Sequence, residues 1–263
     1  MHPIVNIAVS AAREAGRLIM RHFENLEHIE VESKSRHDFV SQVDRDAQHR
    51  IIQVIKKAYP DHAILAEEQD IHELDPNALT WIIDPLDGTT NYLRGIPQFA
   101  VSIAFMEKGL ITHGVILDPL KDELFSASRG QGAQFNRQRL KFKKAKPIEQ
   151  CLIGTGIPFG GNTTYLDAYL GMLKDICPQV SGIRRMGAAS LDLAYVAAGR
   201  LDGFWEIGLK PWDMAAGILM IEEAGGYVTD FHGKADFLES GNVICGSPKI
   251  HPILLEIIKK HIA

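Results

Sequence analysis

The chain has 263 residues, of which 46% are hydrophobic and 23% charged, and its formal net charge is −5. That length and apolar content suffice for a sizeable folded core. The acidic balance argues against a protein built as a whole to bind nucleic acid or an anionic membrane.

Cysteine usage and the N-terminal segment indicate where the protein works. Cys151, Cys177 and Cys245 are far apart and form no C-x-x-C pair, which predicts buried free thiols in a reducing compartment. The first residues lack the pattern of a signal peptide. No window approaches the roughly 18 uninterrupted apolar residues of a membrane span. A soluble, cytoplasmic protein without membrane contacts is therefore expected.

The N-terminal part of the chain shows the apolar periodicity of helices. Residues 3–23 and 44–59 each place apolar side chains on one face, which predicts two amphipathic helices, and Pro60 ends the second. The polar segment 32–44, ESKSRHDFVSQVD, joins them.

After Pro60 the pattern changes to short apolar or alternating runs separated by turn residues, which is typical of strands. Their short connections predict a largely antiparallel sheet. Residues 129–147 predict a hairpin followed by a connector to the second half. The expected strands are 63–66, 81–83, 99–106, 111–117 and 123–128.

The second half alternates strands and helices, which indicates helices on both faces of a second, smaller sheet. The sequence thus predicts an α+β protein of layered helices and sheets, one compact unit over residues 1–263 with halves of approximately 1–147 and 148–263. The expected strands are 151–157, 203–207, 227–231 and 242–246, and the expected helices are 165–176, 189–199, 213–226 and 248–262.

Residues 81–93, WIIDPLDGTTNYL, carry the strongest chemical signal. Asp84 follows an apolar run at what should be a strand end, where ligand crevices form. Pro85 should stop the strand, so that Asp84 and Asp87 converge across a tight turn. Two carboxylates and the Leu86 carbonyl make an oxygen-only donor set, which suits Mg²⁺. Residues 88–90 can open a helix whose N–H groups bind phosphate. A plain Asp-Pro/Asp-Gly turn explains the same residues, and both interpretations stay open here.

Other acids occupy comparable positions. Glu67 and Glu68 directly follow the predicted strand 63–66, and Asp213 stands at the start of a predicted helix. Taken alone, an exposed Glu pair is usually solvated and a helix-initial Asp is usually a simple N-cap. H-E-x-x-H, the P-loop, G-x-G-x-x-G and G-x-S-x-G patterns are missing from the sequence. Metal-assisted hydrolysis of a phosphate ester is therefore the leading hypothesis.

Four segments of the chain resemble the inositol monophosphatase family. The segments D-P-L-D-G-T-T-N (84–91) and W-D-M-A-A-G-I-L-M-I-E-E-A-G-G (212–226) match its two signatures, and L-A-E-E (65–68) and D-F-V-S-Q-V-D (38–44) match two further elements. The likeness covers essentially the whole chain and is closest to the bacterial, SuhB-type members. It implies a layered αβαβα sandwich. Ala66 and Ser41 depart from the usual family residues at positions that supply no metal ligand.

The resemblance also implies metal-site roles. Glu67, Asp84 and the Leu86 carbonyl would hold a first Mg²⁺. Asp84, Asp87 and Asp213 would hold a second, and a weaker third ion would sit at Glu67 through water.

Catalytic and substrate roles follow from the same resemblance. Thr89 would position the attacking water with Asp44 hydrogen-bonded behind it, and Glu67 would assist as a catalytic residue. Gly88 and Thr89 N–H groups would receive phosphate oxygens. The remaining residues implied are Asp87, Ala189, Glu206 and Asp213 around the substrate, and Lys34 on a mobile loop.

The implied reaction is Mg²⁺-dependent hydrolysis of a small phosphorylated polyol, with myo-inositol monophosphate first, in a lithium-sensitive homodimer. Relatives that cleave nucleotide 3′,5′-bisphosphates, fructose bisphosphate, histidinol phosphate or glycerol phosphates keep other substrates open. Some bacterial relatives instead bind the transcription machinery and influence ribosomal RNA synthesis. For such a role the sequence offers a basic stretch at 137–146 and the pair Arg184-Arg185. Charged edge strands usually protect a sheet from aggregation, which explains the basic stretch, and a surface or subunit-interface pair explains Arg184-Arg185.

Overall fold

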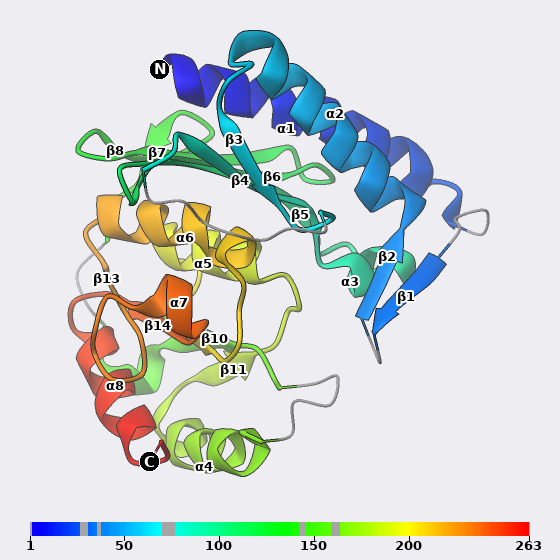
Figure 1. The fold of residues 1–263 in the computed structure, drawn as a ribbon. Coiled ribbons are helices and arrows are strands. Elements are labelled where there is room, and N and C mark those ends of the chain that lie inside the picture. Colours follow the sequence, from blue (N-terminus) through cyan, green and yellow to red (C-terminus); the bar gives the residue numbers. More distant parts are fainter. Residues whose placement is uncertain are drawn as a thin grey trace.

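The protein is a stack of five layers of helices and sheets (Figure 1). From one end to the other these are α1 with α2, a seven-stranded sheet, α5 with α6, a five-stranded sheet, and α4 with α8. In the computed structural model, residues 31–35 and 38–40 are described by their backbone and not by their side chains. The structure describes residues 2–26, 31–35, 38–69, 77–142, 146–158 and 164–262.

The helices begin and end close to where the apolar periodicity predicts. Pro at the first position of α1 and α6 fits the fixed φ of proline at a helix start. Short 3₁₀ turns lie at Ile148–Gln150 and Cys177–Gln179. The helices of the described residues are α1 (Pro3–Phe23), α2 (Gln42–Ala58), α3 (Thr89–Leu93), α4 (Leu166–Ile176), α5 (Ala189–Ala197), α6 (Pro211–Glu223), α7 (Phe237–Ser240) and α8 (Ile250–Lys259).

The first sheet has the order β3-β4-β5-β6-β7-β8-β9, and all its neighbours pair antiparallel except β3 with β4. The prediction of a largely antiparallel sheet is therefore confirmed. Its strands are β3 (Ala63–Ala66), β4 (Thr80–Asp87), β5 (Ala100–Glu107), β6 (Leu110–Asp118), β7 (Glu123–Ser128), β8 (Gly132–Phe135) and β9 (Gln138–Arg139).

The second sheet has the order β11-β10-β12-β14-β13, in which β10 pairs parallel with both its neighbours. A separate hairpin of β1 and β2 lies within the polar segment that the sequence pattern left without structure. These strands are β10 (Leu152–Thr155), β11 (Gly182–Arg184), β12 (Gly203–Glu206), β13 (Tyr227–Thr229), β14 (Val243–Gly246), β1 (Val31–Ser35) and β2 (Asp38–Ser41).

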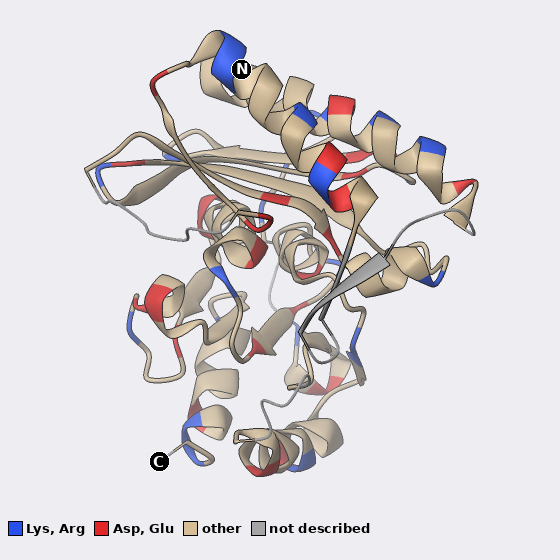
Figure 2. Ribbon diagram, turned by 45° about the vertical axis from the view of Figure 1, so that its right-hand side comes forward, with Lys and Arg blue, Asp and Glu red and all other residues tan. Residues whose placement is uncertain are grey.

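Three hydrophobic clusters fill the spaces between the layers. One lies between α1, α2 and the first sheet, one surrounds α5 and α6, and one lies between the second sheet and α4 with α8. Charged residues cover the outer faces, and acidic segments also lie between the layers (Figure 2). No helix of the described residues is both long and apolar enough to cross a membrane. Cys151 and Cys245 are buried as expected, whereas Cys177 is exposed, so the prediction of three buried thiols was wrong for one of them.

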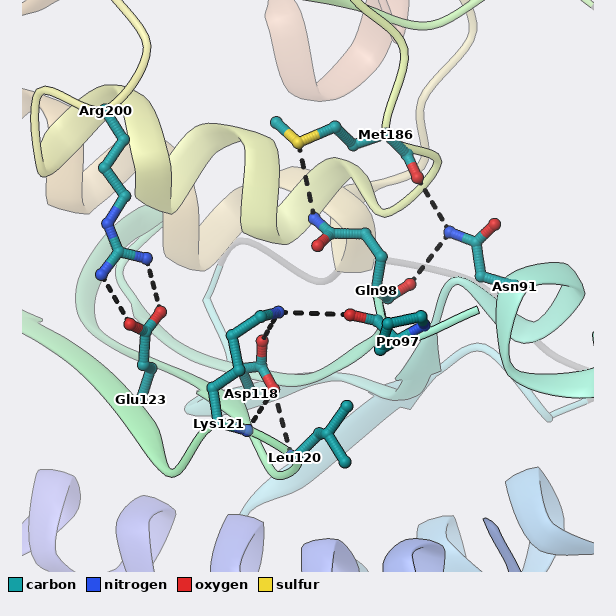
Figure 3. Close-up of polar contacts among 9 residues, drawn as sticks. All are labelled: Asn91, Pro97, Gln98, Asp118, Leu120, Lys121, Glu123, Met186 and Arg200. Carbon is teal, nitrogen blue, oxygen red and sulfur yellow. Dashed lines mark hydrogen bonds and ion pairs between the residues drawn. The ribbon is translucent and has the colours of Figure 1, made fainter. Parts of the chain in front are cut away.

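Tight packing fixes α5 and α6 against each other and against the first sheet. A Cβ atom at Gly217 of α6 would lie 2.4 Å from Cβ of Leu193 on α5, so the two helices meet at closest approach there. Arg200, just after α5, forms a two-pronged ion pair with Glu123 of β7, at 2.5 and 2.6 Å (Figure 3). Its guanidinium also lies over the ring of Tyr195, 4.8 Å from the centroid. The middles of the two helices are thereby held against each other, and the end of α5 is held against the first sheet.

Candidate active site

A cavity of about 650 Å³ opens where the two halves of the chain meet. It is lined by the turn from β4 into α3, the starts of α5 and α6, the ends of β10 and β12, and Glu67 just after β3. Nine of the predicted site residues are among its lining residues, namely Glu67, Asp84, Leu86, Asp87, Gly88, Thr89, Ala189, Glu206 and Asp213.

The strand β4 does not stop at Pro85, contrary to the prediction. It continues to Asp87, and the pairing register shifts because Asp84 faces Ser102 while Asp87 faces Ala100 on β5. Two residues thus oppose one, which is a bulge, the place within a sheet where proline is tolerated. In a regular strand, side chains three positions apart point to opposite faces. The bulge lets Asp84 and Asp87 face the same cavity.

Backbone donors hold the carboxylates in place. Oδ1 of Asp84 accepts the Leu86 N–H at 3.0 Å, and Oδ2 of Asp213 accepts the Lys210 N–H at 2.7 Å. Oδ2 of Asp87 accepts both the N–H and the hydroxyl of Ser190, at 2.8 and 2.5 Å. Ser190 stands in the first turn of α5, so the positive end of that helix faces an acid.

Asp44 lies directly behind Thr89. The Thr89 hydroxyl is 2.8 Å from Oδ1 of Asp44 and 3.0 Å from the Leu86 carbonyl oxygen, and it has one proton to give. Ser41 donates its N–H and its hydroxyl to Oδ2 of Asp44, at 2.8 and 2.5 Å. The hydrogen bond implied between Asp44 and Thr89 is thus present, and the serine at position 41 keeps a hydroxyl on the carboxylate. The catalytic roles of both residues stay predictions.

The acids repel one another strongly. Burial raises the pKa of Asp84 well above its usual range, and the charges of Glu67, Asp87 and Asp213 raise it further. The pKa of Asp213 is raised in the same way, by burial first and then by Glu67 and Asp87. Burial also raises the pKa of Asp87, against the donors of α5. These carboxylates lie close enough to interact, and they need a positive partner to ionise together.

The donor set fits a hard divalent cation. All the candidate donors are oxygen atoms, from carboxylates and one carbonyl, which is the ligand type that Mg²⁺ takes. Within the described ranges, no three His, Cys, Asp or Glu side chains converge as they stand into a finished metal site, and Asp84, Asp87 and Asp213 each accept a hydrogen bond from a backbone N–H group. The mutual repulsion of the acids is what a bound cation would remove.

The same cavity holds a second pair of acids, Glu206 and Asp192, of which the sequence had indicated only Glu206. Burial raises the pKa of Glu206 to about 8, and Arg185 opposes that rise. Asp192 of α5 is 1% exposed, its pKa is raised well above the usual range by burial and by Glu206, and its Oδ1 has no hydrogen-bond partner among the described residues. The sequence did contain a signal for Asp192, which is an acid inside the apolar run A-S-L-D-L-A-Y-V-A. An aspartate is rarely buried in such a run unless it has a partner or a function.

Arg185 is exposed, as the sequence suggested for a surface pair with Arg184, and it also lines this cavity. Lys34, the predicted mobile-loop residue, lies on β1, and its side chain is outside the described residues. Its role near the site stays a prediction.

Glu206 makes the stability of the metal-free protein depend on pH. Its folded-state pKa of about 8 exceeds the ordinary 4.5, so the folded state binds this proton more tightly and loses stability as pH rises through that window. The glutamine side chain in Glu206→Gln carries no charge at any pH. We expect it to raise the melting temperature at pH 8 by on the order of 5 °C and to change little at pH 5. Thermal denaturation in EDTA at both pH values measures this, with the exposed Glu239→Gln as control. An equal shift at both pH values would contradict it.

Comparison with known proteins shows the family of this chain. The model of the inositol monophosphatase family matches residues 1–263. The chain belongs to the inositol monophosphatase family. A relative from Pseudomonas aeruginosa, the Nus factor SuhB, is 51% identical over 100% of this chain and 98% of its own length.

Solved structures of family members have the same fold. The extragenic suppressor protein SuhB from Bartonella henselae superposes with a TM-score of 0.94 at 46% identity, covering 99% of this chain and 100% of its own. An IMPase from Thermotoga maritima gives 0.88 at 35% identity, covering 99% of this chain and 98% of its own. The predicted layered α+β fold is confirmed by these likenesses and by the five layers described above.

Proposed function

We propose that this protein hydrolyses a phosphate monoester with Mg²⁺ as cofactor, and that its substrate is a small polyol phosphate such as myo-inositol monophosphate. The observation that carries the proposal is one cavity lined by Glu67, Asp84, Asp87 and Asp213, with the Thr89–Asp44 hydrogen bond at its edge. Membership of the inositol monophosphatase family supports it.

The acids would hold two or three Mg²⁺ ions. Glu67, Asp84 and the Leu86 carbonyl are the candidate ligands of a first ion, and Asp84, Asp87 and Asp213 of a second. A third would be held more weakly, through water, at Glu67. When bound, such ions lower the pKa of water and neutralise the charge on the phosphate and the departing alcohol.

The chain's own groups would manage the attacking water and the phosphate. While the Thr89 hydroxyl donates to Asp44, its lone pairs are available to accept a proton from a water molecule in the cavity. Because Oδ2 of Asp44 already accepts two hydrogen bonds from Ser41, Oδ1 is the oxygen that faces Thr89 as an acceptor, which favours that orientation over donation to the Leu86 carbonyl. The N–H groups of Gly88 and Thr89 would receive phosphate oxygens, as backbone donors at a turn commonly do.

The far end of the cavity would take the alcohol. Glu206 and Asp192 offer acceptors and Arg185 offers donors, while Ala189 leaves room beside them. Such a lining favours a hydroxyl-rich alcohol over an apolar one, because buried polar groups need partners. Nucleotide bisphosphates, fructose bisphosphate, histidinol phosphate and glycerol phosphates remain the substrates to compare.

Gly156 should control this alcohol subsite. A Cβ atom at residue 156 would lie 1.7 Å from Oε1 of Glu206, so Gly156→Ala must displace that carboxylate. We expect KM for inositol monophosphate to rise about tenfold, with kcat/KM for an aryl phosphate nearly unchanged, because one hydrogen-bonded hydroxyl is worth on the order of 1 kcal/mol or more.

The matched control is Gly182→Ala on β11. The Cβ added there meets the end of the flexible Arg184 side chain at 3.2 Å, which can move aside. Equal losses for the two substrates in Gly156→Ala would argue against an alcohol subsite at Glu206.

Phosphate release is the direct test of the proposed reaction. The purified protein is incubated with inositol 1-phosphate and with a panel of the esters named above, at several Mg²⁺ concentrations, with and without LiCl. We expect Mg²⁺-dependent release that is fastest with the inositol ester and inhibited by Li⁺. Absence of release from every ester at all Mg²⁺ concentrations would refute the proposal.

A second candidate function is binding to the transcription machinery, because relatives at 45–51% identity are named Nus factor or putative Nus factor SuhB. The basic stretch considered for it is not one continuous strand. Among its described residues, 137–142 and 146, only Gln138–Arg139 is in a strand, β9, and Lys146 pairs with Asp202 at 2.9 Å, while residues 143–145 lie outside the described part. Arg137, Arg139, Lys141 and Arg184 are exposed.

Capture of RNA polymerase from a bacterial lysate tests this second function. Asp84→Asn should capture as well as wild type, while Arg137→Glu/Arg139→Glu or Arg184→Glu should capture less. Light scattering on the same samples tests the predicted homodimer. If neither wild type nor Asp84→Asn captures RNA polymerase, this role is excluded.

A further inference from the structure

The side chain of Asn91 joins the two sides of the candidate active site. Its Nδ2 donates to the carbonyl oxygens of Gln98 and Met186, at 2.9 and 2.8 Å (Figure 3). It also lies 3.3 Å from the carbonyl oxygen of Gly187. Asn91 belongs to α3, whereas Met186 and Gly187 directly precede α5. A terminal amide has two hydrogens, so both are used across this junction.

The same junction encloses the turn at Gly88. A Cβ atom there would lie 2.9 Å from the Gln98 carbonyl oxygen and 3.3 Å from that of Gly187. These are two of the carbonyl groups that face Asn91. Gly88 also has a φ of 89°, which only glycine adopts without strain. The turn and the segment before α5 therefore touch, and the Asn91 amide is the hydrogen-bonded link that keeps them together.

The start of α5 connects the Asn91 junction to Asp87, an acid of the site. Two residues after Ala188, Ser190 donates its N–H and hydroxyl to Oδ2 of Asp87. Ala189, between them, lines the cavity. A shift of Met186 and Gly187 would thus move both the donors that orient Asp87 and the wall of the alcohol subsite.

We propose that Asn91 is a positioning residue, which sets the spacing between the Gly88–Thr89 turn and the start of α5 and thereby orients Asp87. The importance of that spacing for catalysis rests on the proposed function, whereas the link itself is independent of it. Loss of the amide would leave the carbonyl groups of Gln98 and Met186 without this donor, and water would enter the junction.

Hydrogen–deuterium exchange tests the link without using activity. Asn91→Ala should increase exchange of the amides of 186–192 by about tenfold or more, since local opening there becomes easier. The matched control is Tyr92→Phe, which removes the hydrogen bond from the Tyr92 hydroxyl to the Ile19 carbonyl, 2.9 Å, on the opposite side of α3. It should leave exchange of 186–192 as in wild type, even where it lowers the melting temperature as much.

Binding and kinetics then test the consequence. Calorimetric titration with Mg²⁺ should show weaker binding in Asn91→Ala than in Tyr92→Phe, and kcat should fall at least about tenfold, because Asp87 is misplaced. If Asn91→Ala does not fold, Asn91→Ser, which keeps one short donor, is measured in its place. Exchange of 186–192 that matches wild type in the folded variant overturns the proposal. A wild type without phosphatase activity would refute the proposed function, and the exchange result would still decide the link.

Discussion

Asp84→Asn should lower phosphate release at least about 10³-fold while the protein stays folded. Asp84 is 2% exposed, and it is the acid that both candidate metal positions share. An amide oxygen can still accept the Leu86 N–H, so the local turn is kept. The neutral amide cannot supply the negative charge that balances a bound cation. Steady-state assays at saturating Mg²⁺ measure the loss.

The same substitution should stabilise the metal-free protein at neutral pH. The pKa of Asp84 is raised in the folded state, so its ionised form disfavours folding, and a neutral amide removes that cost. Asp230→Asn is the matched control. Asp230 is also buried, and its Oδ1 accepts the N–H groups of His232 and Lys234 far from the cavity. That variant should lose melting temperature and keep its activity. Activity of Asp84→Asn within tenfold of wild type would refute the shared role of this acid.

Strong periodicity made most of the fold predictable. The helix over residues 3–23 and the strand over 123–128 have the expected boundaries, because their apolar faces cover one layer each. The strand β4 was predicted too short, since Pro85 is a local stop signal. The neighbouring strand β5 overrides it by pairing across a bulge. β11, with three residues, and α7, with four, are too short to show a period at all.

The candidate site was predictable where its residues lie close in sequence or in a signature. Asp84 and Asp87 belong to one turn. Arg185 and Asn91 are different, because their places depend on how the two halves of the chain pack. Nothing in the sequence near Asn91 indicates that its amide reaches carbonyl groups about ninety-five residues away. Such contacts arise only from the packing of the layers.

Asp44→Asn should reduce kcat by roughly 10²–10⁴-fold, the usual contribution of a proton-accepting group. The Asn oxygen would take the position of Oδ2 and accept both donors of Ser41, so its NH₂ group would face the Thr89 hydroxyl. The Thr89 proton must then point to the Leu86 carbonyl, 3.0 Å away. One lone pair of Thr89 would accept from the new NH₂ donor, and residue 44 could no longer accept the Thr89 proton, so Thr89 could not take a proton from water and pass its own to residue 44.

Thr89→Val and Thr89→Ser separate this proton path from simple packing. Valine keeps the shape without the hydroxyl and should lose activity as Asp44→Asn does, whereas serine should retain most of it. The double variant Asp44→Asn/Thr89→Val should be no slower than the worse single variant, because both changes break the same path. Additive losses in the double variant would instead show that Asp44 acts on the reaction separately from Thr89.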